Sequence, residues 1–133
     1  MATICKSTEI DAPAEAVWDV VADFGAVHRR FAPGFVTDVT LEPGARVVTF
    51  ASGQVLRELF LGSDPQTMRL AYSVQNDLMS HHSASFQVFD LGGGRSRLTW
   101  TADLLPEAAA PIVDGMMTEG LRIAAQTLSQ VGA

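Results

Sequence analysis

The chain has 133 residues, of which 47% are hydrophobic and 18% are charged, so it can bury a substantial core and is not disordered. It carries 15 acidic and 9 basic residues, which give a net charge of −6. The basic residues form no cluster larger than the step His28-Arg29-Arg30, which argues against a nucleic-acid-binding surface. The length predicts one domain over residues 1–133.

The sequence shows no signal for export or membrane insertion. The first residues lack an apolar signal core, and no apolar run approaches the roughly 18 residues of a membrane span. The single cysteine, Cys5, cannot form an intramolecular disulfide, which suits a reducing compartment. We therefore expect a cytoplasmic protein without integral membrane association, either a monomer or a homodimer.

Hydrophobic periodicity predicts seven strands, two short helices after the first strand, and a long final helix. In chain order, the predicted elements are a strand over residues 3–10, a helix that ends at Gly25, a short helix over 26–31, strands over 35–41, 46–51, 54–62, 67–74, 81–91 and 96–104, and a helix over 107–131. Short loops such as Ser52-Gly53 join the later strands, which indicates an antiparallel meander and an α+β fold.

The final helix carries one apolar stripe, because its apolar residues recur at steps of three and four. The stripe consists of Val113, Met116, Met117, Leu121, Ala124, Leu128 and Val131. About 22 helical residues span roughly 33 Å, which is the width of a small domain. We infer that the sheet wraps around this helix, and that the space between them determines the function.

Alternation along the strands predicts which side chains face the helix. The predicted inner set includes Val48, Phe50, Tyr72, His82, Phe86 and Trp100. Residues 54–62 allow two assignments, because one apolar set would turn Arg57 inward and the other would turn Glu58 inward. A buried, unpaired charge costs several kcal/mol, so an inward charge implies water, a partner side chain or a ligand.

Gly120 interrupts the apolar stripe of the final helix at a cost of about 1 kcal/mol relative to alanine. It leaves room for either a ligand or a close strand. We favour ligand space, because Met116 lies one turn before it and methionines let a pocket adapt its shape.

No metal site or cofactor is expected. His81 and His82 are adjacent on a strand and point to opposite faces, and no HxH or HExxH spacing occurs. His82 alone is a candidate general acid or base near the mouth of a cavity. No compact catalytic triad is visible in the sequence.

Four stretches together resemble one protein superfamily. They are EIDAPAEAVWDVVADF, VLRELFLGSDP, RSRLTWTADLLP and IVDGMMTEGLRIAAQTL, in that order along nearly the whole chain. The chain resembles the START-like, helix-grip (SRPBCC) proteins, which include the polyketide cyclase/dehydrase and lipid-transport family, the birch-pollen allergens and the plant abscisic-acid receptors.

The resemblance implies a curved seven-stranded antiparallel sheet that grips the long helix around an apolar cavity. It also implies that the loops at Ser52-Gly53 and residues 75–80 guard the cavity mouth. Many relatives carry an acidic residue where we align Arg57, and an arginine there would favour an anion or carbonyl ligand.

Three functions are compatible with these observations. The first is binding of a small apolar or aromatic, lipid- or polyketide-like molecule, for which the candidate ligand-binding residues are Val48, Phe50, Arg57, Leu59, Tyr72, His82, Phe86, Trp100, Met116, Gly120 and Leu121. The second is a polyketide cyclase or dehydratase, in which Arg57 polarises a carbonyl and His82 or Tyr72 moves protons. The third is a protein-interaction module similar to co-chaperone relatives, which requires an exposed apolar patch.

Overall fold

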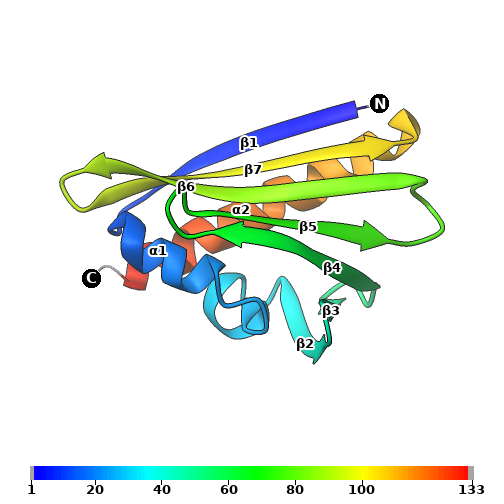
Figure 1. Cartoon of the computed structure of the whole chain (residues 1–133), viewed down its shortest axis with the longest axis horizontal. Helices are drawn as coiled ribbons and strands as arrows, with labels where there is room; N and C mark the ends of the chain where they lie inside the picture. Colours follow the sequence, from blue (N-terminus) through cyan, green and yellow to red (C-terminus); the bar gives the residue numbers. More distant parts are fainter. Residues whose placement is uncertain (1, 132–133) are drawn as a thin grey trace.

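The computed structural model describes residues 2–131 and contains a seven-stranded antiparallel sheet with a long C-terminal helix (Figure 1). In chain order, the elements are β1 (Ala2–Ile10), α1 (Ala14–Val21), η1 (Val27–Phe31), β2 (Val36–Glu42), β3 (Ala45–Phe50), β4 (Val55–Asp64), β5 (Arg69–Gln75), β6 (His81–Gly92), β7 (Arg95–Leu105), η2 (Glu107–Ala109) and α2 (Ala110–Val131). The strand order in the sheet is β1-β7-β6-β5-β4-β3-β2. The predicted helix-grip fold is confirmed.

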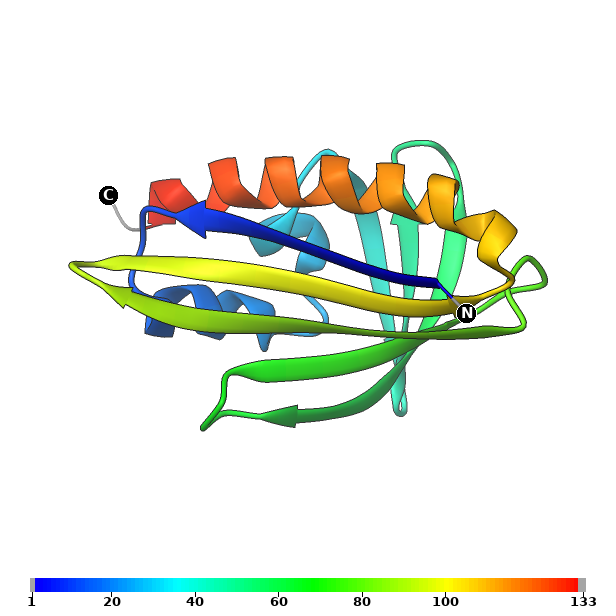
Figure 2. The same ribbon diagram turned by 90° about the horizontal axis from the view of Figure 1, so that it is seen from above.

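The sheet curves around α2 because its strands are long and interrupted by bulges. Register shifts occur in β2, in β4 between Phe60 and Gly62, and in β6 between Asp90 and Gly92, and each bulge increases the local twist. Figure 2 shows α2 lying along β1, with β2 and β3 crossing behind it. An ion pair of 3.1 Å between Lys6 of β1 and Asp114 of α2 lies at this edge.

Burial increases along α2 from its N-terminal end to its C-terminal end. Ile112 is 67% exposed, Val113 and Met116 are half-buried, and Ala124 and Leu128 are fully buried. The C-terminal part of the helix therefore packs into the solid core with Leu121, while its N-terminal part covers a more open region.

Local details differ from the sequence-based expectation. The short helix expected at residues 26–31 is a single π-helical turn, and α2 is preceded by a 3-10 turn. The strand expected to begin at residue 67 begins at Arg69, because Met68 adopts a left-handed conformation with φ of 54°. The Asp64 carboxylate accepts hydrogen bonds from the Gln66 amide and the Thr67 hydroxyl, which extends the turn before β5.

Gly120 allows α2 to approach two aromatic rings. A Cβ atom at this position would lie 3.1 Å from Phe35 Cε2 and 3.1 Å from Trp100 Cζ3. The space beside Gly120 is therefore already occupied, although the residue also borders a small cavity described below. A larger side chain at this position would therefore meet the two rings and would not enter the ligand space that we favoured from the sequence.

We predict that Gly120→Leu lowers the free energy of unfolding by about 1–3 kcal/mol, because the added side chain overpacks the contact with Phe35 and Trp100. Gly115→Leu is the matched control, since Gly115 lies in the same helix with nothing within 4 Å of its Cβ position. Thermal unfolding should show a melting temperature several degrees lower for the first variant and unchanged or higher for the control. Equal melting temperatures for the two variants would contradict the packing role.

Candidate ligand-binding cavity

A cavity with two adjoining chambers lies between α2 and the inner face of the sheet. The outer chamber has a volume of about 290 Å³ and lies beneath the N-terminal half of α2. The inner chamber has a volume of about 50 Å³ and lies against α1, η1 and β2. The residues that border both chambers, which we call the neck, are Phe35, Phe50, Glu58, Tyr72 and Trp100.

Three aromatic side chains on neighbouring strands line this cavity as a row of stacked rings, which we call the aromatic wall. The rings of Tyr72 and Phe86 are stacked with an interplanar angle of 17°, and those of Phe86 and Trp100 are stacked with centroids 4.6 Å apart. Phe86 lies directly opposite Trp100 in the pairing of β6 with β7. Cross-strand aromatic pairs stabilise a sheet and supply a large apolar surface.

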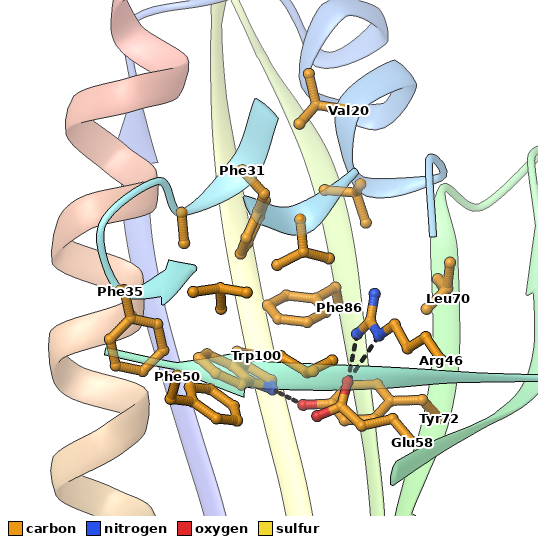
Figure 3. Close-up of a pocket in the computed structure, with 16 residues that line it drawn as sticks. Val20, Phe31, Phe35, Arg46, Phe50, Glu58, Leu70, Tyr72, Phe86 and Trp100 are labelled. Carbon is orange, nitrogen blue, oxygen red and sulfur yellow. Dashed lines mark hydrogen bonds and ion pairs between the residues drawn. The ribbon is translucent and has the colours of Figure 1, made fainter. Parts of the chain in front are cut away.

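A buried ion pair between Arg46 of β3 and Glu58 of β4 lies beside this wall (Figure 3). The two residues are direct cross-strand partners and are only 5% and 6% exposed. Glu58 Oε1 accepts a hydrogen bond of 2.7 Å from Arg46 Nε and also lies 2.7 Å from Arg46 Nη2. Arg46 donates a further hydrogen bond of 3.1 Å to the Phe24 carbonyl, and its guanidinium lies 3.9 Å from the centroid of the Phe24 ring. All three contacts hold the guanidinium away from the solvent.

The sequence left two assignments of β4 open, and the structure turns Glu58 inward, so the candidate residue Arg57 does not border the cavity. Arg57 lies on the outer face of the sheet, where it forms an ion pair of 2.9 Å with Glu42 and a hydrogen bond of 2.9 Å with Gln75. Leu59, on the same outer face, is half-buried and borders neither chamber. The preference for an anionic ligand that we based on Arg57 therefore loses its structural basis.

Most of the other predicted residues do border the cavity. They are Val48, Phe50, Tyr72, His82, Phe86, Trp100, Met116 and Gly120. Leu121 does not, because it is 5% exposed and belongs to the core beyond the cavity.

Arg46 was not among the predicted cavity residues, although the strand pattern contained the signal. Arg46 is two residues before Val48 and four before Phe50, so alternation places all three on one face. A hairpin around Ser52 then sets Arg46 opposite Glu58, and opposite residues of an antiparallel pair share a face. Other cavity residues outside the predicted set include Phe35, Leu56, Val74 and Met117.

Tyr72 presents a neutral phenol at the neck. Its oxygen accepts a hydrogen bond of 3.0 Å from Trp100 Nε1. Burial, reinforced by the negative charge of Glu58, raises the pKa of Tyr72 well above its usual value. The phenol therefore stays protonated, and its O–H group can act as a donor.

His82 is buried and neutral. Its Nδ1 accepts a hydrogen bond of 3.0 Å from the Val74 amide, so the proton of the neutral ring lies on Nε2. Burial, and to a smaller extent the charge of His81, lowers the pKa of His82 from 6.5 to about 4. The ring borders the outer chamber and can donate one hydrogen bond.

The mouth of the outer chamber is apolar. Leu78 and Met79 of the β5–β6 loop and Ile112 of α2 border it, and Leu78 and Ile112 are 66% and 67% exposed. The Asn76 side chain shapes this loop by accepting hydrogen bonds of 3.0 Å from the amides of Leu78 and Met79. The loop over residues 75–80 thus lies where the family resemblance implied, and Gln54 borders the chamber beside the Ser52-Gly53 loop.

Within residues 2–131, no three histidine, cysteine, aspartate or glutamate side chains are placed to hold a metal ion. No helix in the same range has the length and hydropathy required to cross a membrane.

Comparisons with known proteins agree with this geometry. The model of the family described as polyketide cyclase / dehydrase and lipid transport matches residues 1–129. No curated protein sequence matches the chain. Among solved structures, a protein from Thermobifida fusca is 29% identical with a TM-score of 0.80, and the match covers 98% of this chain and 95% of that one.

Two more distant structures share the fold. A START superfamily protein from Mycobacterium smegmatis is 18% identical with a TM-score of 0.71, and the match covers 98% of this chain and 96% of that one. Norcoclaurine synthase from Thalictrum flavum, solved in complex with dopamine and hydroxybenzaldehyde, is 19% identical with a TM-score of 0.73, and the match covers 98% of this chain and 85% of that one. At these identities the similarity establishes the fold, and the predicted superfamily is confirmed.

The lowered pKa of His82 predicts a loss of stability in acid. The unfolded state binds a proton near pH 6.5 whereas the folded state resists it until about pH 4, so the stabilisation is present above pH 6.5 and is lost as the pH falls through this window. His82→Asn is the reference, because it retains an acceptor near the position of Nδ1. Between pH 7 and pH 4, the free energy of unfolding of the wild type should fall by as much as about 3 kcal/mol more than that of His82→Asn. Urea unfolding of both proteins at several pH values measures the difference. If the free energy of unfolding changed with pH in the same way for both proteins, the folded state would not hinder protonation of His82, which would contradict the prediction.

The buried ion pair predicts that a single substitution lowers the stability of the protein more than a double substitution does. Arg46→Met should destabilise the protein by about 3–5 kcal/mol, because it leaves the Glu58 carboxylate buried without its cation. The double variant Arg46→Met/Glu58→Leu removes both charges and should recover most of this loss. Chemical denaturation of the two variants and the wild type tests the coupling, and an additive double variant would contradict it.

Proposed function

The chain belongs to the polyketide cyclase / dehydrase and lipid transport family, and we propose that it binds a small, flat, largely apolar molecule in the cavity between α2 and the sheet. The observation that carries the proposal is the outer chamber of about 290 Å³, which opens between apolar side chains at its mouth and ends at the aromatic wall. Ligand sites are typically concave and apolar, with a few placed polar groups.

The volume of the chamber indicates the size of the ligand. An engineered protein cavity of about 150 Å³ binds benzene, so roughly twice that volume suits a molecule of two or three fused rings. Trp100 borders the outer chamber, whereas Phe86 borders only the inner one and is stacked on Trp100, so the Trp100 ring offers the aromatic surface that such a molecule can contact.

Met116 and Met117 of α2 line the opposite side of the outer chamber. Their unbranched side chains can adjust to ligands of different shape. The cavity argues against the protein-interaction hypothesis. A protein that acts only through its surface would be expected to have a filled interior without a cavity.

A cyclase or dehydratase activity is the second candidate, and the polar groups of the outer chamber support it. The Glu58 carboxylate, the Tyr72 phenol and the neutral His82 ring all border this chamber. A carboxylate can accept a proton and a phenol or imidazole can donate one, which are the roles that aldol cyclisation and dehydration require.

The binding proposal predicts that naphthalene-sized hydrophobic probes raise the melting temperature. A probe at 100 times its dissociation constant stabilises the folded state by about 2.7 kcal/mol, which corresponds to several degrees. Met116→Trp should abolish the shift by filling the outer chamber. Thr118→Trp adds the same ring to the exposed side of α2 and is the control that keeps the shift. Absence of a shift with every probe in a broad panel would rule against the binding function.

The enzymatic alternative predicts a separation of turnover from affinity. With a linear poly-β-ketone thioester as substrate, His82→Ala should abolish cyclised product, measured by mass spectrometry, and leave affinity nearly unchanged. Two results together would favour binding alone: the wild-type protein binds this substrate without converting it, and His82→Ala lowers the affinity.

A further inference from the structure

The two oxygens of the Glu58 carboxylate differ, because one contacts Arg46 and the other can accept a hydrogen bond from a ligand. Oε1 accepts the hydrogen bond from Arg46 Nε and also lies 2.7 Å from Arg46 Nη2, whereas Oε2 receives no hydrogen bond from a protein donor within residues 2–131. An ionised carboxylate offers about four acceptor positions, and a buried one is stabilised when they are filled. Because Glu58 belongs to the neck, Oε2 is an acceptor that faces the space where a ligand would lie.

No free positive charge accompanies this oxygen. Arg46 is the only cationic side chain among the residues that line the two chambers, and its guanidinium is already held by Glu58 and by the Phe24 carbonyl. The other side-chain donors that border the outer chamber are neutral as well; they are the Tyr72 phenol, the His82 and Trp100 rings and the amides of Gln54 and Asn76. None of them can offset the charge of a bound anion.

The remaining surface is mostly apolar, so electrostatic interactions in the cavity are weakly screened. A ligand carboxylate at the neck would meet the like charge of Glu58, and a ligand ammonium would compete with Arg46 for the same carboxylate. A hydroxyl group meets neither cost, and it donates a charge-assisted hydrogen bond to Oε2.

We propose that the cavity selects neutral ring molecules whose polar end is a hydroxyl group that donates to Glu58, and that it rejects carboxylates, including fatty acids. This inference rests on the proposed binding function and specifies its ligand class. The ring would lie in the outer chamber against Trp100, with its hydroxyl group directed to Glu58 at the neck.

Three probes that differ in one substituent test the selection. They are 2-naphthol, 2-naphthoate and 2-methylnaphthalene, titrated into the wild-type protein at pH 7.5 by isothermal calorimetry. We expect 2-naphthol to bind at least tenfold more tightly than 2-methylnaphthalene, and 2-naphthoate to bind most weakly.

Variants connect this order to the ion pair. In Arg46→Met/Glu58→Leu, 2-naphthol should lose its advantage and bind within about threefold of 2-methylnaphthalene. Glu42→Gln is the matched control, since it removes a carboxylate that pairs with Arg57 on the outer face, and it should leave the order unchanged. The wild-type ranking decides the question on its own if the double variant does not fold.

Two results would overturn the inference while leaving the binding function intact. One is 2-naphthoate binding as tightly as 2-naphthol to the wild type, and the other is an unchanged ranking in the folded double variant. Failure of all three probes to bind would instead remove the binding function, and the inference with it.

Discussion

The buried ion pair between Arg46 and Glu58 is the constraint on which the rest of the cavity depends. Removing two charges from water is costly, and the cost is met only when geometry and additional hydrogen bonds are favourable. Adjacent strands supply the geometry, because Arg46 of β3 lies directly opposite Glu58 of β4. The segment after α1 supplies the additional contacts through the carbonyl and the ring of Phe24. The pair therefore links the first helices to the far strands of the sheet.

The helix α2 serves two purposes along its length. Its C-terminal half completes the core through fully buried residues such as Ala124 and Leu128. Its N-terminal half covers the outer chamber with Val113, Met116 and Met117. Gly120 lies between the two halves and lets the helix approach Phe35 and Trp100 closely. A firmly anchored helix can thus leave a cavity at one end without losing its position on the sheet.

Much of the fold was predictable because the patterns were unambiguous. The strict alternation in β5 and β7 placed Tyr72 and Trp100 on the inner face, and the stripe of α2 identified its buried side. The orientation of β4 was not predictable from that strand alone, because Leu56 and Leu59 mark opposite faces with equal hydrophobicity. Its neighbour β3 resolves the ambiguity through the pairing of Arg46 with Glu58. The filled space beside Gly120 depends on two rings from distant segments, which no local pattern reveals.

The most direct test of this account is a crystal structure of the protein with 2-naphthol bound. The account predicts that the ring lies against Trp100 and that its oxygen lies about 2.5–2.7 Å from Glu58 Oε2, with the Arg46 contact to Oε1 retained. A naphthol ring at the mouth beside Leu78 and Ile112, with its oxygen directed to solvent, would contradict it. So would an ion pair that opens to let Arg46 bind the ligand.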